Sequence, residues 1–256
     1  MDSPTLLLDQ SNHVLTLTLN QPAKLNPLDL PQWDELARAF SRARDDAGIR
    51  AIVLTGAGRA FSAGGDIRGM RERRDAAEQI ARLNRINAVI EQLADLPKPT
   101  IAALGGVAAG IGASLALACD LIVAEERATL VCSWAKIGMA PDGGASWRLV
   151  RLIGPRRAKE LMMTTRPLPA AEALAWGLVN QVAPVGQALA CAQALAYTIV
   201  SFSPHALRHA KALADSASTA TLAQQLAAEA QAQGECVESA EFQAAVAAFL
   251  ARQPDR

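Results

Sequence analysis

The sequence lacks the features that usually mark membrane, secreted or nucleic-acid-binding proteins. None of its apolar runs reaches the ~18 residues that a membrane-spanning helix needs. No basic and then apolar segment follows Met1, so we expect no secretory leader. The 25 Lys and Arg residues are balanced by 25 Asp and Glu residues, which leaves no overall basic surface for a nucleic acid. These absences predict a cytoplasmic protein with neither a membrane nor a nucleic-acid partner.

Cysteine and histidine are also scarce. The four cysteines form no CxxC pair and the three histidines lie elsewhere in the sequence, so we expect neither a disulfide framework nor a metal site. Cys119 and Cys132 stand in apolar surroundings and are predicted to be buried thiols. His205 and His209 have the spacing of neighbours on one helix face, but no third metal ligand accompanies them.

The balanced charge has one local exception, the cluster of Arg68, Arg71, Arg73 and Arg74. One interpretation is a solvated helix face. The other is that one or two of these arginines contact phosphate groups of a small ligand. The sequence leaves both interpretations open.

Two glycine-rich turns are the most informative feature that is present. The first runs from Thr55 to Asp66 and the second from Gly105 to Gly112. Each follows a strand-like run and precedes a helix-like one. Glycine lets the backbone approach a ligand closely, and the start of a helix carries free N–H groups. Two such turns predict an oxyanion hole, in which backbone N–H groups stabilise a developing enolate or tetrahedral oxygen.

Strand-like and helix-like segments alternate along most of the chain, which predicts an α/β core. A helix is expected after the cap residue Asp29, and another over Asp75–Leu96, which ends before Pro97. After about residue 185 the chain is rich in Ala, Gln, Leu and Glu, with almost no strand signal. We therefore predict a core over residues 1–185 and a helical region over 186–256. The expected strands are His13–Leu19, Ala51–Leu54, Thr100–Leu104, Leu121–Ala124 and Thr129–Cys132.

Several segments in this order resemble the crotonase (enoyl-CoA hydratase/isomerase) superfamily. Besides the two glycine turns, the matching segments are Asn20–Asn26, Ala116–Asp120, Lys136–Gly144, Ala175–Asn180 and Phe249–Arg252. The resemblance implies a spiral of ββα units over residues 1–185, followed by a helical trimerisation region over 186–256. It also implies a homotrimer or a dimer of trimers. The implied substrate is a coenzyme A thioester, with no cofactor beyond its coenzyme A moiety.

The resemblance also assigns roles by position. The thioester oxygen would lie between the backbone N–H groups of Gly65 and Ile111, and the bulky Ile111 side chain would narrow the acyl pocket. Lys24 and Arg68 would contact phosphates, Asp66 would fix its turn, and Arg252 would reach the adenine end of a neighbouring subunit's site. The residues implied to line the coenzyme A groove are Lys24, Leu25, Ala63, Asp66 and Arg68.

The implied chemistry depends on carboxylates. At the positions where family hydratases carry two glutamates, this chain has Ser114 and Trp134, and neither can act as a carboxylate base. One acidic residue remains nearby, Asp142. Members that shift a double bond often carry a single acid at this position, and one carboxyl suffices if it reaches both carbons. From local sequence alone, Pro-Asp-Gly also reads as a β-turn, with Asp142 bonding its own backbone.

The sequence also leaves other functions open. Trp134 is expected to be an apolar wall of the acyl pocket and Ser114 a small residue that widens it. The pair Trp134 and Asp142 also resembles 4-chlorobenzoyl-CoA dehalogenases, in which the tryptophan helps to hold a nucleophilic aspartate. That reaction needs a histidine where this chain has Asn87. A hydratase with an unconventional site and a non-catalytic acyl-CoA-binding homologue are further alternatives. A nucleotide-binding α/β protein is disfavoured, because Gly110-Ile111-Gly112 lacks the third glycine of GxGxxG.

Overall fold

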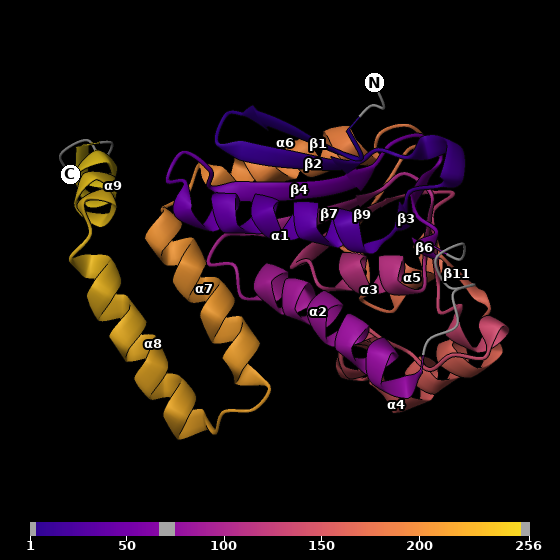
Figure 1. The fold of residues 1–256 in the computed structure, drawn as a ribbon. Coiled ribbons are helices and arrows are strands. Elements are labelled where there is room, and N and C mark those ends of the chain that lie inside the picture. The colour runs from indigo at the N-terminus through magenta and orange to yellow at the C-terminus, as the bar shows by residue number, and fades with distance from the viewer. Residues whose placement is uncertain (1–3, 67–74, 252–256) are drawn as a thin grey trace.

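The computed structural model describes residues 4–66 and 75–251 (Figure 1). Its largest sheet has six strands in the order β1-β2-β4-β7-β9-β12, of which only β1 runs antiparallel to its neighbour. A four-stranded sheet has the order β11-β10-β8-β5, and β3 pairs with β6 in a two-stranded one. The strands are β1 Leu6–Ser11, β2 Val14–Leu19, β3 Pro27–Leu28, β4 Ala51–Gly56, β5 Ala60–Ser62, β6 Gly64–Gly65, β7 Thr100–Leu104, β8 Val107–Ala109, β9 Leu121–Glu125, β10 Thr129–Val131, β11 Pro167–Pro169 and β12 Gln181–Ala183.

The helices complete a repeating pattern. Strands β4 and β5 lead to α2, β7 and β8 lead to α3, and β9 and β10 lead to α4, so each unit gives one strand to each of the larger sheets. This is the predicted spiral of ββα units. The helices are α1 Leu30–Asp45, α2 Ala76–Ala94, α3 Ile111–Leu117, α4 Ala145–Thr164, α5 Ala170–Ala175, α6 Ala188–Val200, α7 Pro204–Ala217, α8 Leu222–Val237 and α9 Ala240–Ala251.

Local sequence explains where the first two long helices begin. The Asp29 carboxylate accepts the Gln32 N–H at 3.0 Å, and the Gln32 side chain accepts the Asp29 N–H, which together form a capping box. Asp75 and Glu78 repeat this arrangement at the start of α2. Helix α1 begins directly after the predicted cap Asp29, and α2 begins one residue after its predicted start, because Asp75 is its cap. Both caps satisfy N–H groups that the helix itself cannot.

The core lies on both faces of the six-stranded sheet. A large cluster joins one face to α1, α2, α3 and the four-stranded sheet. On the other face, Ala188, Ala192 and Ala196 of α6 pack against strand residues such as Val53 and Ile101. Figure 1 shows α1 and α6 on opposite sides of the sheet. The domain boundary at residue 185 stays a prediction, and α6, the first helix beyond it, packs on the core sheet.

The helical region predicted over residues 186–256 contains α6 and the three helices that follow it, α7, α8 and α9. No residue of α7 or α9 is buried, and Ala232 is the single buried residue of α8. In Figure 1, α8 and α9 extend away from the body of the molecule. None of the described helices is long and apolar enough to cross a bilayer.

The two predicted buried thiols are buried. Burial raises the pKa of Cys119 to about 12 and that of Cys132 to about 11. Both therefore remain protonated thiols near neutral pH.

Candidate active site

The two glycine turns meet in the structure. Gly64 has a φ of +98°, and a Cβ atom there would lie 2.8 Å from the carbonyl oxygen of Ala109. Only glycine allows both this backbone conformation and this close approach. The contact brings Gly65, the next residue, to the junction at which Gly110 leads into Ile111.

A loop from the N-terminal part of the chain fixes this junction. The Asn26 side chain is buried and donates to the carbonyl oxygens of Ala57 and Ala60, both at 2.9 Å. The Ser62 hydroxyl donates to the Asn26 carbonyl at 2.7 Å and accepts the Gly64 N–H at 3.1 Å. These bonds set the position of the first turn. The roles of the Asn26 and Ser62 side chains were not predicted, because their bonds to the carbonyls of Ala57, Ala60 and Asn26 join groups more than 30 residues apart in the sequence.

Ile111 is the first residue of α3. Its N–H has no partner within the helix, because the first N–H groups of a helix lack a carbonyl four residues earlier. The Ile111 side chain is buried, as are all other residues of α3. The backbone N–H of Ile111 therefore has no acceptor within α3 and lies at the start of a fully buried helix. Its role in an oxyanion hole stays a prediction.

The third component is the turn that carries Asp142. A Cβ atom at Gly143, where φ is +58°, would lie 2.5 Å from Ile111 Cδ1, so only glycine lets the turn seat against α3. The fully buried Ser114 hydroxyl donates to the Asp142 carbonyl at 2.9 Å. The Ala145 N–H donates to the same carbonyl at 3.2 Å, which closes a turn over residues 142–145, one residue beyond the predicted Pro-Asp-Gly turn. Ser114 thus holds the backbone beneath Asp142, and a contact between Ser114 and substrate stays a prediction.

Trp134 holds the carboxylate itself. Its indole N–H donates to Asp142 Oδ1 at 2.8 Å, and the side chain is buried. The sequence interpretation of Trp134 as an apolar wall did not include this polar contact, which the resemblance to dehalogenases did imply. A Cβ atom at Gly110 would lie 4.0 Å from Trp134 Nε1. The hydrogen bond therefore lies beside the second glycine turn.

The protonation of Asp142 reflects two opposing influences. Burial raises the pKa of its carboxyl above the ordinary value, because the surroundings solvate the charge poorly. The Trp134 N–H, the positive charge of Arg82 and the backbone N–H of Asp142 itself oppose this by stabilising the carboxylate. The net result is a raised pKa, which makes the carboxylate a stronger base than an exposed aspartate.

The residues predicted to bind coenzyme A are placed in part. The Leu25 carbonyl accepts a hydrogen bond from the Ala63 N–H at 2.8 Å, and the Leu28 carbonyl accepts one from the Asp66 N–H at 3.3 Å. Leu25 therefore lies beside the first glycine turn. Lys24 is exposed nearby, at the end of the short 3₁₀ helix over Pro22–Lys24. Arg68, the other arginines of its cluster (Arg71, Arg73 and Arg74) and Arg252 lie outside the described residues.

Two hollows border this centre. One, of about 420 Å³, is lined by Leu25, Arg59 and Arg127. Neither arginine was predicted as a site residue. Arg59 lies within the first glycine-rich turn, and Arg127 lies in no recognisable motif. The other hollow, of about 500 Å³, lies between α2 and α4 and is lined by Asp142 and Asn87 among others. Asn87 therefore faces the same space as Asp142.

Comparisons with known proteins agree with this geometry. The sequence matches a family described as enoyl-CoA hydratase/isomerase over residues 9–255. The 1,2-epoxyphenylacetyl-CoA isomerase of Escherichia coli K12 is 37% identical over 243 residues, covering 94% of this chain and 93% of the relative. The 4-chlorobenzoyl coenzyme A dehalogenase-2 of Arthrobacter sp. is 40% identical over 179 residues, covering 68% of this chain and 64% of the relative. The structure of an enoyl-CoA hydratase from Polaromonas sp. JS666 superimposes with a TM-score of 0.91 at 36% identity, covering 98% of each chain.

The chain belongs to the enoyl-CoA hydratase/isomerase family. The resemblance drawn from the motifs is thereby confirmed, and so is the predicted α/β fold with its helical C-terminal region. The protein is an acyl-CoA-transforming enzyme of this family. The similar proteins have names for several different reactions, so family membership alone does not select one of them.

Proposed function

We propose that this enzyme shifts a double bond within an acyl-CoA thioester, with Asp142 as the single acid/base group. The observation that supports this most directly is the set of contacts around Asp142: a carboxyl with a raised pKa, held by Trp134, on a turn seated against α3. At the two positions where a hydratase would carry glutamates, this chain has Ser114 and Trp134. Both of these residues donate hydrogen bonds to Asp142.

The proposed reaction uses one base twice. The thioester oxygen accepts hydrogen bonds from the N–H groups of Gly65 and Ile111. The Asp142 carboxylate removes a proton from the α or γ carbon, and the electron pair moves into a dienolate whose negative charge lies on that oxygen. The protonated Asp142 then returns the proton to the other end of the dienolate. The N–H groups accelerate the reaction because they bind the oxyanion more strongly than the neutral thioester.

The same proposal places the coenzyme A moiety along the loop of Lys24 and Leu25, past Ala63 and Asp66. Arg59 and Arg127 supply positive charge beside Leu25, in the hollow of about 420 Å³, and are suited to contact phosphate groups. Arg68 and Arg252 remain proposed phosphate-side and adenine-side contacts. No cofactor beyond the substrate's own coenzyme A moiety is proposed, and the proposed assembly is a homotrimer or a dimer of trimers.

One observation favours a second candidate, a 4-chlorobenzoyl-CoA dehalogenase-like reaction. The hydrogen bond from Trp134 to Asp142 suits a carboxylate that attacks an aromatic carbon, expels chloride and forms an aryl ester. Water must then cleave that ester. Asn87 lines the hollow beside Asp142, at the position where the resemblance implies a histidine that activates this water. An amide cannot accept a proton as imidazole does, so this candidate ranks second.

Liquid chromatography, which separates double-bond isomers of equal mass, combined with mass spectrometry of the acyl-CoA thioesters tests both candidates. The panel contains 2-enoyl, 3-enoyl and 4-chlorobenzoyl thioesters, each incubated with the natural enzyme, with Asp142→Asn and with Glu91→Gln. Glu91 is exposed and lines the same hollow as Asp142, so its variant is the matched control. We expect an enoyl thioester of unchanged mass with a shifted double bond. Asp142→Asn should lower kcat by about 10²- to 10⁴-fold with thioester binding retained, and Glu91→Gln should leave kcat unchanged.

The other outcomes identify the alternatives. Gain of one water by a 2-enoyl thioester would replace the isomerase proposal with an unconventional hydratase. Loss of chloride from the aromatic thioester would select the dehalogenase-like reaction. Binding of every thioester without any conversion would point to a non-catalytic homologue.

A further inference from the structure

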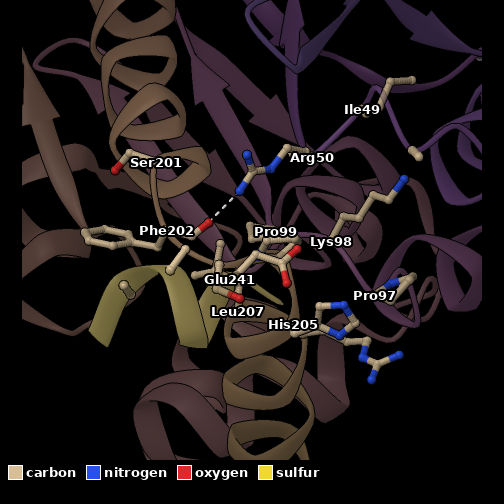
Figure 2. A pocket seen from close by; sticks show the side chains of 16 residues that line it. Ile49, Arg50, Pro97, Lys98, Pro99, Ser201, Phe202, His205, Leu207 and Glu241 are labelled. Carbon is tan, nitrogen blue, oxygen red and sulfur yellow. Dashed lines mark hydrogen bonds between the residues drawn. The ribbon is translucent and has the colours of Figure 1, made fainter. Parts of the chain in front are cut away.

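A separate cavity of about 750 Å³ lies at the N-terminal ends of strands in the middle of the six-stranded sheet. Arg50 and Pro99 line it, and these residues directly precede strands β4 and β7. The glycine turns of the candidate active site follow the opposite ends of the same strands. The turn between α6 and α7 and one face of α9 complete the cavity wall, as Figure 2 shows. It shares no lining residue with the groups that surround Asp142.

The charged lining is mostly cationic. Arg50, Lys98 and Arg208 face a single carboxylate, Glu241, among the described residues of the wall, and the His205 imidazole also lines it. Two of the cations already have partners. The Lys98 ammonium donates to the carbonyls of Ala43 and Asp46, at 2.5 and 2.8 Å. Arg208 lies 3.4 Å from the carboxylate of Glu235.

The guanidinium of Arg50 has unused hydrogen-bonding capacity. One of its terminal nitrogens donates to the Phe202 carbonyl at 2.5 Å. Its Nε is buried and has no acceptor within the part of the chain that the structure describes. A buried donor without an acceptor is costly. Figure 2 shows the Arg50 guanidinium beside the Phe202 carbonyl, and Glu241 and His205 line the same cavity.

The remaining wall is largely apolar. Pro97, Pro99 and Leu207 line the cavity, together with Ala244 and Ala245 of α9. Phe202 also lines the cavity and is 58% exposed. Small-molecule sites typically combine such an apolar lining with a few polar groups that orient the ligand.

We propose that this cavity binds an amphipathic organic anion, a carboxylate on a hydrocarbon body. The carboxylate would accept charge-assisted hydrogen bonds from Arg50, and the hydrocarbon would cover Phe202 and the alanines of α9. Glu241 would repel the ligand's negative charge. The proposal does not depend on which reaction the active site catalyses, because it uses none of its residues.

Calorimetric titration of the full chain tests the proposal with octanoate, octanol and inorganic phosphate as probes. We expect octanoate to bind at least tenfold more tightly than octanol or phosphate, because only octanoate combines a carboxylate with a hydrocarbon chain. Arg50→Gln should weaken octanoate binding at least tenfold, and Glu241→Gln should strengthen it severalfold. Arg44→Gln removes the same charge from an exposed position of α1 outside the cavity and should have no effect.

Two further measurements separate this cavity from folding defects and from the acyl-CoA site. Ala244→Trp fills the cavity without changing its charge and should abolish octanoate binding, whereas Ala247→Trp, on the same helix outside the lining, should not. Saturating octanoyl-CoA, a thioester without a double bond to shift, should leave octanoate binding intact. Binding that survives Ala244→Trp, displacement by octanoyl-CoA, or phosphate binding as tight as that of octanoate would overturn the proposal.

Discussion

The five phenylalanines divide the molecule into two regions that are stabilised differently. Phe40 and Phe61, in the α/β core, are completely buried. Phe202, Phe242 and Phe249, which follow α6, are 58%, 38% and 63% exposed. Leu222 and Leu226 of α8 are also exposed. The two core phenylalanines are buried within one chain, whereas Phe242 and Phe249 of α9 and the two leucines of α8 lie on the surface, as in a segment that packs against other subunits.

The same contrast applies to backbone freedom. The candidate active site is built from close contacts, such as that of Gly143 with Ile111, which leave little room for movement. Helix α7 is held to the core partly by one polar contact, between Lys211 and Asp120 at 3.0 Å. The groups of the candidate site therefore lie in the closely packed region of the chain.

The sharpest test of the comparison is a matched pair of phenylalanine substitutions. Phe40→Ala should lower the free energy of unfolding by about 3–5 kcal/mol, because it leaves a cavity in a close-packed core. Phe249→Ala should change it by less than about 0.5 kcal/mol at dilutions where the chain is monomeric. Urea unfolding measures both values, and sedimentation of Phe249→Ala at high concentration should show a smaller assembly. Equal losses of stability would contradict the division into two regions.

Removing one backbone donor tests the rigid site. Proline is tolerated in the first turn of a helix, so Ile111→Pro should remove the N–H of Ile111 while α3 persists. We expect kcat/KM to fall by about 10²- to 10³-fold, as for the loss of other oxyanion-hole donors. Ile111→Val keeps the N–H and shortens the side chain that packs on Gly143. The Val variant should retain most activity, and a Val variant as impaired as the Pro variant would assign the effect to packing.

The contact between Trp134 and Asp142 predicts a pH effect. Trp134→Phe removes a hydrogen bond that lowers the pKa of Asp142, so that pKa should rise further. A base acts only when deprotonated, and activity is therefore lost as the pH falls through its pKa. The acid limb of the kcat/KM profile should therefore move to higher pH, and activity should fall most at the acid end of the profile. An unchanged acid limb would mean that Asp142 does not control the profile.

The smallest expected effect concerns the attachment of α7. Lys211 is largely buried and pairs with Asp120, whose carboxylate also accepts the Thr100 N–H and hydroxyl. Lys211→Met should cost about 1 kcal/mol of stability and should speed amide exchange in α7 while exchange in β7 stays slow. Lys159→Met, at an exposed position of α4, provides the control. Faster exchange in both elements would show that α7 and the core unfold together.

Much of the fold follows from short-range patterns in the sequence. The caps at Asp29 and Asp75, the strand over Thr100–Leu104 and the helical character after residue 185 were all predictable, because each depends on neighbouring residues. Strands as short as β5 and β6 were not predicted. They hold too few residues for an alternating pattern, and their hydrogen bonds go to β8 and β3.

The candidate site divides in the same way. The sequence by itself determined the two glycine turns, the absence of the paired glutamates and the single Asp142, because residue identity alone decides what chemistry a side chain can perform. Only the tertiary structure decided that Ser114 and Trp134 hold Asp142, that Asn26 and Ser62 fix the first turn, and that α6 packs on the core sheet. These contacts join residues that lie on different elements, and local sequence does not encode which elements will meet. Their physical origin is the burial of the apolar faces of those elements in one close-packed core.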